Sequence, residues 1–439
     1  MNRLCFPALA CAVLLSLSPA PSHAGAGPSV TTLRNGLRVV LAPDSLATAV
    51  DVSVWYPAGT RWEPKGMAGV SSLVSRLMYR GSAHFPDGEH VRLLGAEGAT
   101  LGNSNTPDAA SYSQTIPAGA LTLALRLEAD RMRGLAVSAK AFDASRAQAL
   151  ADRRLRAEAT PMARGLSRLV ATAFGDGAYG RSPWGEADDL RRLTPATVEA
   201  WRRSHYGAGG AVLTITGLFE PAGTLASVRT LFEAIPRGAA SPFAPVPLPP
   251  AGERRAWTAG QTPLRLAFAG WRGPGSGDAD APAFELLAAA LGADSSRYRS
   301  ALESEWKVAV ATECGLQSYR DASLLWVAAA LDAGADSSAA ERVMLDEVGR
   351  LAREPLPAEP FTRLRSRLVL DALFGSQAVR ARAAAIGEAV FEHDDPALVG
   401  RRIEALENLT PEDVQRVARK WLLDSGRSVS WYVPAGEGR

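Results

Sequence analysis

The sequence predicts an α+β protein made of two homologous halves, each a mostly antiparallel sheet covered by helices. Short strand-like runs alternate with long helical stretches along the chain. A Leu-Thr-Pro helix start at residues 193–198 recurs at 409–414, an offset of 216, and a strand-like run follows each copy. At the same offset, Trp55 and Trp271 each end a strand-like run. Two matches at one offset indicate an internal repeat.

The first elements follow from hydrophobic periodicity. Residues 30–41 have the pattern of two short strands around an Asn-Gly turn, and residues 51–56 alternate as a half-buried strand does. Residues 69–81 predict a helix, because apolar side chains recur at i, i+3, i+4, i+7 and i+8 from Val70. Gly81 stands where a left-handed C-terminal cap would end that helix.

The later elements are predicted in the same way. In the first half they are a short helix at 90–94, a strand at 111–116, helices at 118–135 and 139–159, a helix from Pro195 capped by Thr194, and a strand at 211–216. In the second half they are strands at 264–270 and 428–433. A proline-rich connector at 236–262 divides a first domain at 25–235 from a second at 263–439.

Residues 1–24 have the pattern of a secretory signal peptide. Arg3 supplies the positive start, residues 9–17 form a short apolar core, and Ser-His-Ala at 22–24 is a small-x-small cleavage site. The core is shorter than the ~20 apolar residues that a membrane anchor needs. We therefore expect an exported periplasmic protein with no transmembrane segment. The formal net charge of +2 gives no electrostatic reason to expect a nucleic-acid partner.

The predicted helix at 69–81 has a second, polar face. Ser72, Ser75 and Arg76 lie together on it, because residues three and four apart are neighbours on a helix. In zinc peptidases with an inverted His-x-x-Glu-His motif, these positions hold two metal ligands and the general base. A neutral serine is a poor zinc ligand, and an arginine is permanently positive with no acceptor atom. The sequence therefore predicts no catalytic residue, no bound metal and no cofactor.

The chain resembles the insulinase/pitrilysin family of zinc peptidases, in particular the branch of the mitochondrial processing peptidase. The order and spacing of several fragments carry the resemblance: residues 33–40, 59–63, 66–70, 78–82, 128–132, 183–185, 193–195 and 217–221. It implies two α/β-roll domains of the LuxS/processing-peptidase-like type. It also implies clamshell assemblies of four such domains, which in some members pair a zinc-bearing chain with a chain whose site is degenerate.

The resemblance also assigns individual positions. The family's third zinc ligand, a glutamate on a later helix, corresponds to Asp152 within one residue, and we expect Asp152 to pair with Arg76 or Arg153. An edge strand that pairs with bound peptide in active members corresponds to four predicted substrate-binding residues: Gly102, Asn103, Ser104 and Asn105. The family's substrate-holding Arg and Tyr in the second half are replaced by Glu303 and Val310.

The scattered histidines match no metal motif. We expect His84 and His90 to be solvated loop residues and His393 to lie in an exposed acidic turn. The sequence contains no Gly-x-Ser-x-Gly elbow and no phosphate-binding loop either.

Three functional hypotheses remain at this point. In the first, the chain is a catalytically inactive homologue, the non-catalytic subunit of an exported heterodimeric zinc metallopeptidase. Its partner is a catalytic subunit of the same family, and together they form a chamber for peptides or unfolded polypeptide. In the second, it is a stand-alone peptide-binding or scaffold protein of the cell envelope, comparable to the degenerate core subunits of the mitochondrial respiratory complex; loss of the Arg/Tyr pair favours this. In the third, it is a hydrolase with an unrecognised site.

Overall fold

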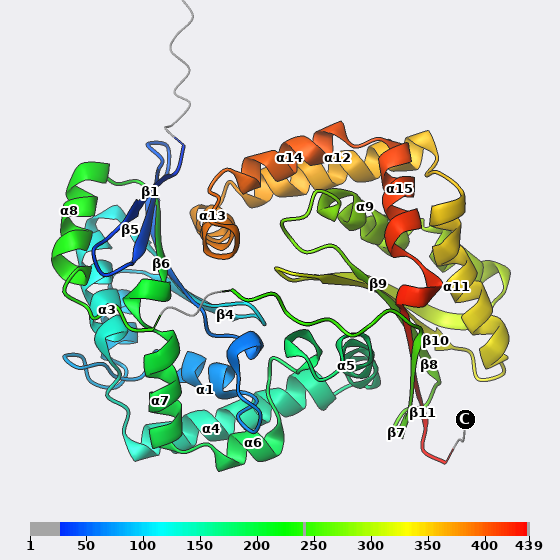
Figure 1. Ribbon diagram of the computed structural model, residues 1–439, viewed down its shortest axis with the longest axis horizontal. Helices are drawn as coiled ribbons and strands as arrows, with labels where there is room; N and C mark the ends of the chain where they lie inside the picture. The colour runs from blue at the N-terminus through cyan, green and yellow to red at the C-terminus, as the bar shows by residue number, and fades with distance from the viewer. Residues whose placement is uncertain (1–26, 240–242, 437–439) are drawn as a thin grey trace, which may run out of the picture.

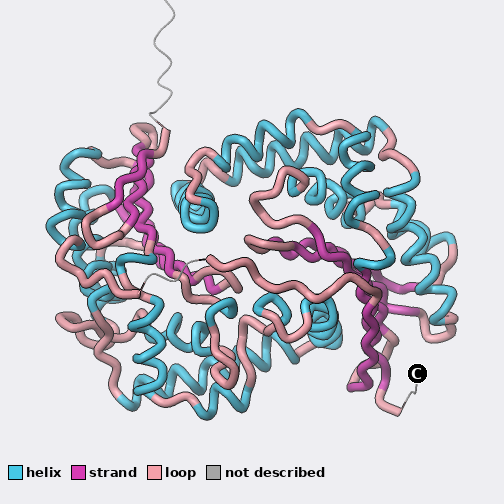
Figure 2. Tube along the Cα trace, viewed as in Figure 1, coloured by secondary structure: helices cyan, strands magenta, loops and turns pink. Residues whose placement is uncertain are grey.

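The computed structural model describes residues 27–239 and 243–436, so the predicted leader at 1–24 lies outside the described residues. Two sheets, one from each half of the chain, lie side by side with helices on their faces (Figures 1 and 2). This arrangement confirms the predicted fold class of two homologous α+β halves. No helix in the described ranges is both long and apolar enough to cross a bilayer.

The first sheet has six strands in the order β1-β2-β6-β3-β5-β4. Its strands are β1 (Ser29–Thr32), β2 (Arg38–Pro43), β3 (Ala49–Tyr56), β4 (Thr100–Asn105), β5 (Ala110–Pro117) and β6 (Val212–Gly217). The helices of this half are α1 (Val70–Leu77), α2 (Glu89–Ala96), α3 (Leu121–Arg133), α4 (Ala139–Arg153), α5 (Pro161–Phe174), α6 (Ala187–Arg192), α7 (Pro195–His205) and α8 (Pro221–Phe232). The order leaves β4 at one edge, paired only with β5.

The second sheet has five strands in the order β7-β11-β8-β10-β9. Its strands are β7 (Arg254–Gly260), β8 (Leu266–Gly273), β9 (Ala309–Ser318), β10 (Ser323–Leu331) and β11 (Arg427–Pro434). The helices of this half are α9 (Ala281–Gly292), α10 (Arg297–Arg299), α11 (Ser337–Arg353), α12 (Ala358–Gly375), α13 (Val379–His393), α14 (Leu398–Asn408) and α15 (Pro411–Trp421).

The two sheets share one topology, as the repeat predicted. Strand β6 pairs parallel to β2 and antiparallel to β3, and β11 pairs in the same way with β7 and β8. The repeated Leu-Thr-Pro segments also have the same local structure. Thr194 and Thr410 cap α7 and α15, and each cap is a capping box with proline at the first helical position.

The second sheet begins earlier than the proline pattern indicated. Strand β7 lies inside the predicted connector at 236–262 and pairs in parallel with β11. The prolines end at Pro250, and the chain then becomes strand-like, with Trp257 against Trp431 at a ring-centroid distance of 5.6 Å. Pairing with a strand 170 or more residues away is a long-range contact, so local composition did not reveal it.

Each half lends one helix to the other half's sheet. Helix α5 packs on β8 and β11, with Leu169 and Phe174 buried against Phe268. Helix α13 packs on β3 and β6, with Val390 and Phe391 buried in one cluster with residues of the first sheet. Figure 1 shows α13 seen end-on beside the first sheet and α5 beside the second. The exchange buries apolar faces that each sheet cannot cover with its own helices.

A glycine makes each of these contacts possible. A Cβ on Gly165 of α5 would meet the ring of Phe268, and a Cβ on Gly387 of α13 would meet the indole of Trp55. Glycine inside a helix normally destabilises it by roughly 1 kcal/mol relative to alanine. These two glycines instead allow an aromatic ring of the opposite sheet to lie directly on the helix backbone.

We therefore expect Gly387→Ala to lower the free energy of unfolding by about 1–3 kcal/mol, because the new methyl overlaps Trp55. The matched control is Gly400→Ala in α14, where a Cβ meets nothing within 4 Å. That control should raise stability by up to about 1 kcal/mol. Urea unfolding followed by circular dichroism measures both variants. Equal stability of the two would contradict the packing of α13 on the first sheet.

Candidate functional site

Helix α1 lines the candidate site, a cleft beside the first sheet. Its predicted apolar stripe is confirmed: Val70, Leu73 and Val74 are fully buried. The helix ends at Leu77, however, and not at a left-handed Gly81 as predicted. Gly81 is needed for a different reason, since a Cβ there would lie 2.6 Å from the carbonyl oxygen of Ala136 where the chain turns back.

A carboxylate that the sequence analysis did not identify caps the start of α1. Glu63 accepts hydrogen bonds from the backbone N–H of Gly69 at 2.9 Å and of Ser71 at 3.0 Å, and also from the Ser71 hydroxyl. These donors would otherwise be unsatisfied, and the negative charge lies at the positive end of the helix dipole. Glu63 thus holds α1 in place, and its position shortly before the helix was the available signal.

At the family's metal positions, Arg76 binds both Ser72 and Asp152, while Ser75 binds a tyrosine of the first sheet. Arg76 donates to the backbone oxygen of Ser72 at 2.9 Å and to its hydroxyl at 3.2 Å, and its guanidinium forms an ion pair with Asp152 of α4. Ser75 accepts a hydrogen bond from the hydroxyl of Tyr112 at 3.2 Å. Of the two predicted partners of Asp152, the structure selects Arg76.

Arg153 has different partners. It forms ion pairs with Glu158 and, at 3.0 Å, with Glu186. Consecutive helix residues point about a quarter-turn or more apart, so Asp152 and Arg153 face different neighbours.

These side chains do not fit a zinc ion. A guanidinium has no lone pair to offer and its charge repels a cation, and the hydroxyls of Ser72 and Ser75 are engaged in hydrogen bonds. Across the described residues, no three or more histidine, cysteine or acidic side chains are grouped so that they could hold a metal ion. Chemistry at a bound zinc therefore finds no support in this cleft.

The cleft itself is retained. It has a volume of about 670 Å³, and Ser75, Arg76, Tyr79, Asn103 and Asp152 are among the residues that line it. It is bounded by α1, by α2, by α4 and by the edge strand β4. An open space therefore lies beside α1, while the side chains at the family's metal positions do not fit a metal ion.

The four predicted substrate-binding residues form the end of β4. Gly102, Asn103, Ser104 and Asn105 pair with β5 in antiparallel register. The hydroxyl of Tyr79 donates to the backbone oxygen of Gly102 at 2.7 Å, and the Asn105 side chain donates to the hydroxyl of Ser71 at 3.4 Å. The structure thus brings this strand end to α1. Binding of peptide there remains a prediction.

Neither of the family's substrate-holding side chains, Arg and Tyr, is present at the matching positions of the second half. Glu303 accepts a hydrogen bond from the hydroxyl of Thr312 at 2.6 Å, while Val310 on β9 is 54% exposed. A cavity of about 940 Å³ lies between α9, β9, α12 and α13. Two carboxyls, Glu388 and Glu392, lie one turn apart on α13 and line this cavity. Glu392 belongs to the acidic segment around His393 that the sequence predicts to be an exposed turn, but it lies in the helix and is only 7% exposed.

Two of the histidine predictions are wrong. His90 is only 4% exposed, because the periodicity of α2 turns it inward with Leu94, and burial lowers its pKa to about 3. His393 ends α13, and its Nε2 lies 2.9 Å from the hydroxyl of Ser276. His84 is largely exposed as expected, with its Nδ1 against Asp130.

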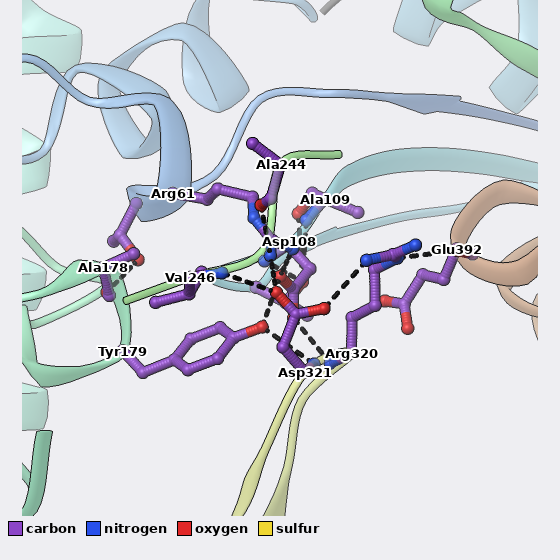
Figure 3. Close-up of polar contacts among 12 residues, drawn as sticks. Arg61, Asp108, Ala109, Ala178, Tyr179, Ala244, Val246, Arg320, Asp321 and Glu392 are labelled. Carbon is purple, nitrogen blue, oxygen red and sulfur yellow. Dashed lines mark hydrogen bonds and ion pairs between the residues drawn. The ribbon is translucent and has the colours of Figure 1, made fainter. Parts of the chain in front are cut away.

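A buried ionic cluster joins the two halves between these sites (Figure 3). Arg61 of the first half lies between Asp108, at 2.5 Å, and Asp321 of the second half. Arg320 donates its backbone N–H to Asp108 at 2.9 Å and its side chain to the backbone oxygen of Glu392 at 2.7 Å. The cluster therefore connects the start of β5 directly to the end of α13.

Comparisons with known proteins agree with this geometry. The family model described as insulinase (peptidase family M16) matches residues 38–185, and the model described as peptidase M16 inactive domain matches residues 192–368. An uncharacterized zinc protease of Streptomyces coelicolor is 24% identical over 403 residues, which is 89% of this chain and 86% of that protein. A probable mitochondrial-processing peptidase subunit beta of Arabidopsis thaliana is 24% identical over 427 residues, 92% of this chain and 78% of that protein.

One solved structure supports the fold in the same way. The crystal structure of a protease from Helicobacter pylori superposes with a TM-score of 0.85 at 20% identity, over 93% of this chain and 99% of that chain. At this level of identity the similarity establishes the fold.

The chemistry of the cleft predicts how the protein behaves toward zinc. The wild-type chain, exposed to zinc and dialysed, should retain less than about 0.1 ion per chain, and chelators should leave its unfolding temperature unchanged. The positive control is the variant with Ser72→His, Ser75→Glu, Arg76→His and Asp152→Glu, which should bind about one ion. Elemental analysis by mass spectrometry measures both. Stoichiometric zinc in the wild type would refute our interpretation of the cleft.

The carboxyls of the second cavity predict a pH dependence of stability. Burial, and next the nearby carboxylates of Glu388 and Asp108, raise the pKa of Glu392 from 4.5 to about 8. The native state therefore holds a proton that the unfolded chain releases above about pH 4.5, so stability should fall as the pH rises from 4.5 to 8.

Glu392→Gln should remove the contribution of this residue to the slope of unfolding free energy against pH. It should also raise the free energy of unfolding at pH 8 by roughly 1–3 kcal/mol. Glu359→Gln, at an exposed residue of α12, should leave the slope unchanged. Urea titrations at several pH values between 4.5 and 8 provide the measurement. A slope identical in wild type and Glu392→Gln would show that Glu392 titrates normally.

Proposed function

The chain belongs to the insulinase family, peptidase M16, as a non-catalytic homologue, and on that basis we propose that it is the non-catalytic subunit of an exported two-chain zinc peptidase. The ion pair between Arg76 and Asp152 is the observation that carries the proposal, because it occupies the family's metal position with the cleft still open. The partner subunit holds the metal and the general base. This chain closes the chamber and contributes a binding wall.

The edge strand β4 supplies the binding function. An extended peptide can add to an exposed sheet edge through main-chain hydrogen bonds, whatever side chains the edge carries. Gly102 to Asn105 lie at such an edge beside α1, and Asn103 lines the cleft, so an extended chain paired with this edge would pass beside the cleft. We expect the ligands to be peptides or unfolded polypeptide in extended conformation.

The relatives support the pairing of two chains. The Arabidopsis relative is named as one subunit of a processing peptidase, and the alignment covers 92% of the present chain. The family partner would contribute an intact His-x-x-Glu-His helix.

Export is part of the proposal. The signal-like residues 1–24 support delivery to the periplasm, where the pair would act on peptides or unfolded polypeptide. Cell fractionation tests this part: the full chain should appear in the periplasmic fraction, and a chain lacking residues 2–24 should remain in the cytoplasm.

One observation favours a second function, that of a stand-alone peptide-binding or scaffold protein of the envelope. Glu303 and Val310 occupy the positions of the family's substrate-holding Arg and Tyr, and Glu303 is used in a hydrogen bond to Thr312. A chain that supplied half of a peptidase chamber would be expected to keep that pair, so its loss favours a chain that acts without a peptidase partner.

Co-expression distinguishes the two functions. A family member with an intact His-x-x-Glu-His motif, taken from a neighbouring reading frame, should co-purify with this chain at equal stoichiometry. The complex should cleave an unfolded peptide at least tenfold faster than the partner alone, because two chains are needed to enclose the substrate. This chain by itself should show no chelator-sensitive cleavage. A stable homodimer that ignores every family member would instead support the scaffold function.

A further inference from the structure

Helix α13, which belongs to the second half of the chain, extends to β4, the candidate peptide-binding strand of the first half. Arg380, the second residue of α13, belongs to the second half, yet its guanidinium lies against β4 of the first sheet. Its Nη1 donates to the backbone oxygen of Leu101 at 3.5 Å. Its Nη2 occupies the place that a Cβ on Gly102 would take. Glycine at position 102 therefore makes room for this guanidinium.

Arg380 uses little of its capacity to donate hydrogen bonds. Within the described ranges it forms no ion pair, and the long contact to Leu101 is its one hydrogen bond. A guanidinium carries five N–H donors, so most of its capacity remains unused. Arg382, two residues further along the same helix, differs from Arg380 because it forms an ion pair with Asp44 at 2.6 Å.

Asp51 of the first sheet attracts Arg380 electrostatically, but its oxygens already accept other hydrogen bonds. Asp51 on β3 accepts hydrogen bonds from Thr115 at 2.7 Å and from Ser53. Burial raises the pKa of Asp51, and Arg380 only partly opposes that rise. The Asp51 carboxyl is therefore engaged within the first sheet by Thr115 and Ser53.

The position of Arg380 defines what a bound strand would meet. Residues directly opposite one another in paired strands have side chains on the same face, with Cβ atoms about 4.5–5.5 Å apart. A peptide residue facing Gly102 would project its side chain onto the α13 face of the sheet, where Nη2 of Arg380 stands in the place of the glycine's Cβ. An acid group one or two bonds beyond that peptide Cβ comes within hydrogen-bonding range.

We propose that Arg380 is a carboxylate-binding subsite, which selects extended peptides carrying an aspartate or glutamate opposite Gly102. The proposal rests on the proposed binding of peptide along β4 and adds its specificity. Charge-assisted hydrogen bonds from a guanidinium to a carboxylate are about twice as strong as neutral ones, and they are lost when the acid becomes an amide. The preferred ligand is an acidic peptide, held by its backbone at β4 and by its carboxylate at α13.

The test uses the full mature chain and short fluorescent peptides that form extended strands. The peptides are amidated at the C-terminus and carry Asp, Glu or Asn at one central position; a fourth carries Asn and a free C-terminal carboxylate. Fluorescence anisotropy at low salt should show that the wild type binds the acidic peptides about tenfold more tightly than the amidated Asn peptide. Strong binding of the fourth peptide would assign the subsite to a chain end, with the same chemistry.

Two variants separate specificity from structure. Arg380→Gln should reduce binding of the acidic peptides to the level of the Asn peptide, and Arg380→Lys should restore part of the preference. Arg363→Gln removes the same charge from an exposed arginine of α12 and should keep the preference intact. Thermal unfolding of each variant confirms that it is folded.

The negative results are also distinct. Equal binding of acidic and Asn peptides by the wild type, or an unchanged preference in Arg380→Gln, would overturn the subsite and leave the peptide-binding function in place. Failure of the wild type to bind any of the four peptides would overturn both.

Discussion

The reciprocal exchange of α5 and α13 is the contact on which the rest of the molecule depends. Each half has a sheet with one face that its own helices leave uncovered, and the other half covers it. Gly165 and Gly387 bring the aromatic rings of Phe268 and Trp55 directly onto the helix backbones. Apolar burial is the dominant stabilising contribution in folding, so each sheet depends on the helix of the other half to bury its uncovered face.

The buried ionic cluster between the two halves fixes their relative orientation, which the apolar contact by itself does not. Arg61 lies between carboxylates from the two halves, and its side chain is only 5% exposed. A buried ion pair contributes little net stability, but breaking one is expensive, because it leaves a desolvated charge. The cluster therefore fixes how the halves meet more than how strongly they adhere. The same relation fixes α13, and with it the place of Arg380 on β4 and of Glu392 in the second cavity.

The degenerate cleft shows how a metal site can lose its chemistry and keep its architecture. In the family's active members, two imidazoles and two carboxylates surround a cation at this position. Here the cation is replaced by a guanidinium that belongs to the chain, and Asp152 pairs with it. The charge that a metal would have supplied now comes from Arg76. The cleft stays open because Arg76 balances the charge of Asp152, and the edge strand β4 lies beside it.

The sequence by itself determined the elements and their duplication. Local periodicity located α1, β3 and β6, and the capped helix starts at Thr194 and Thr410 revealed the repeat, since both signals depend only on near neighbours in the chain. The replacement of ligands by Ser72, Ser75 and Arg76 was also visible, because the chemical nature of a side chain does not change with its surroundings. The end of α1 was not, since a long-range contact at Ala136 decided the role of Gly81.

The tertiary structure alone decided which charges meet. The sequence predicted either Arg76 or Arg153 as the partner of Asp152, and the packing of the helices selects Arg76. Arg380 and Gly102 stand 278 positions apart in the sequence, and only the passage of α13 across the seam brings them together. The same passage buries Glu392 and raises its pKa. Charge pairing and desolvation depend on distances between remote segments, and a pattern of neighbouring residues does not contain those distances.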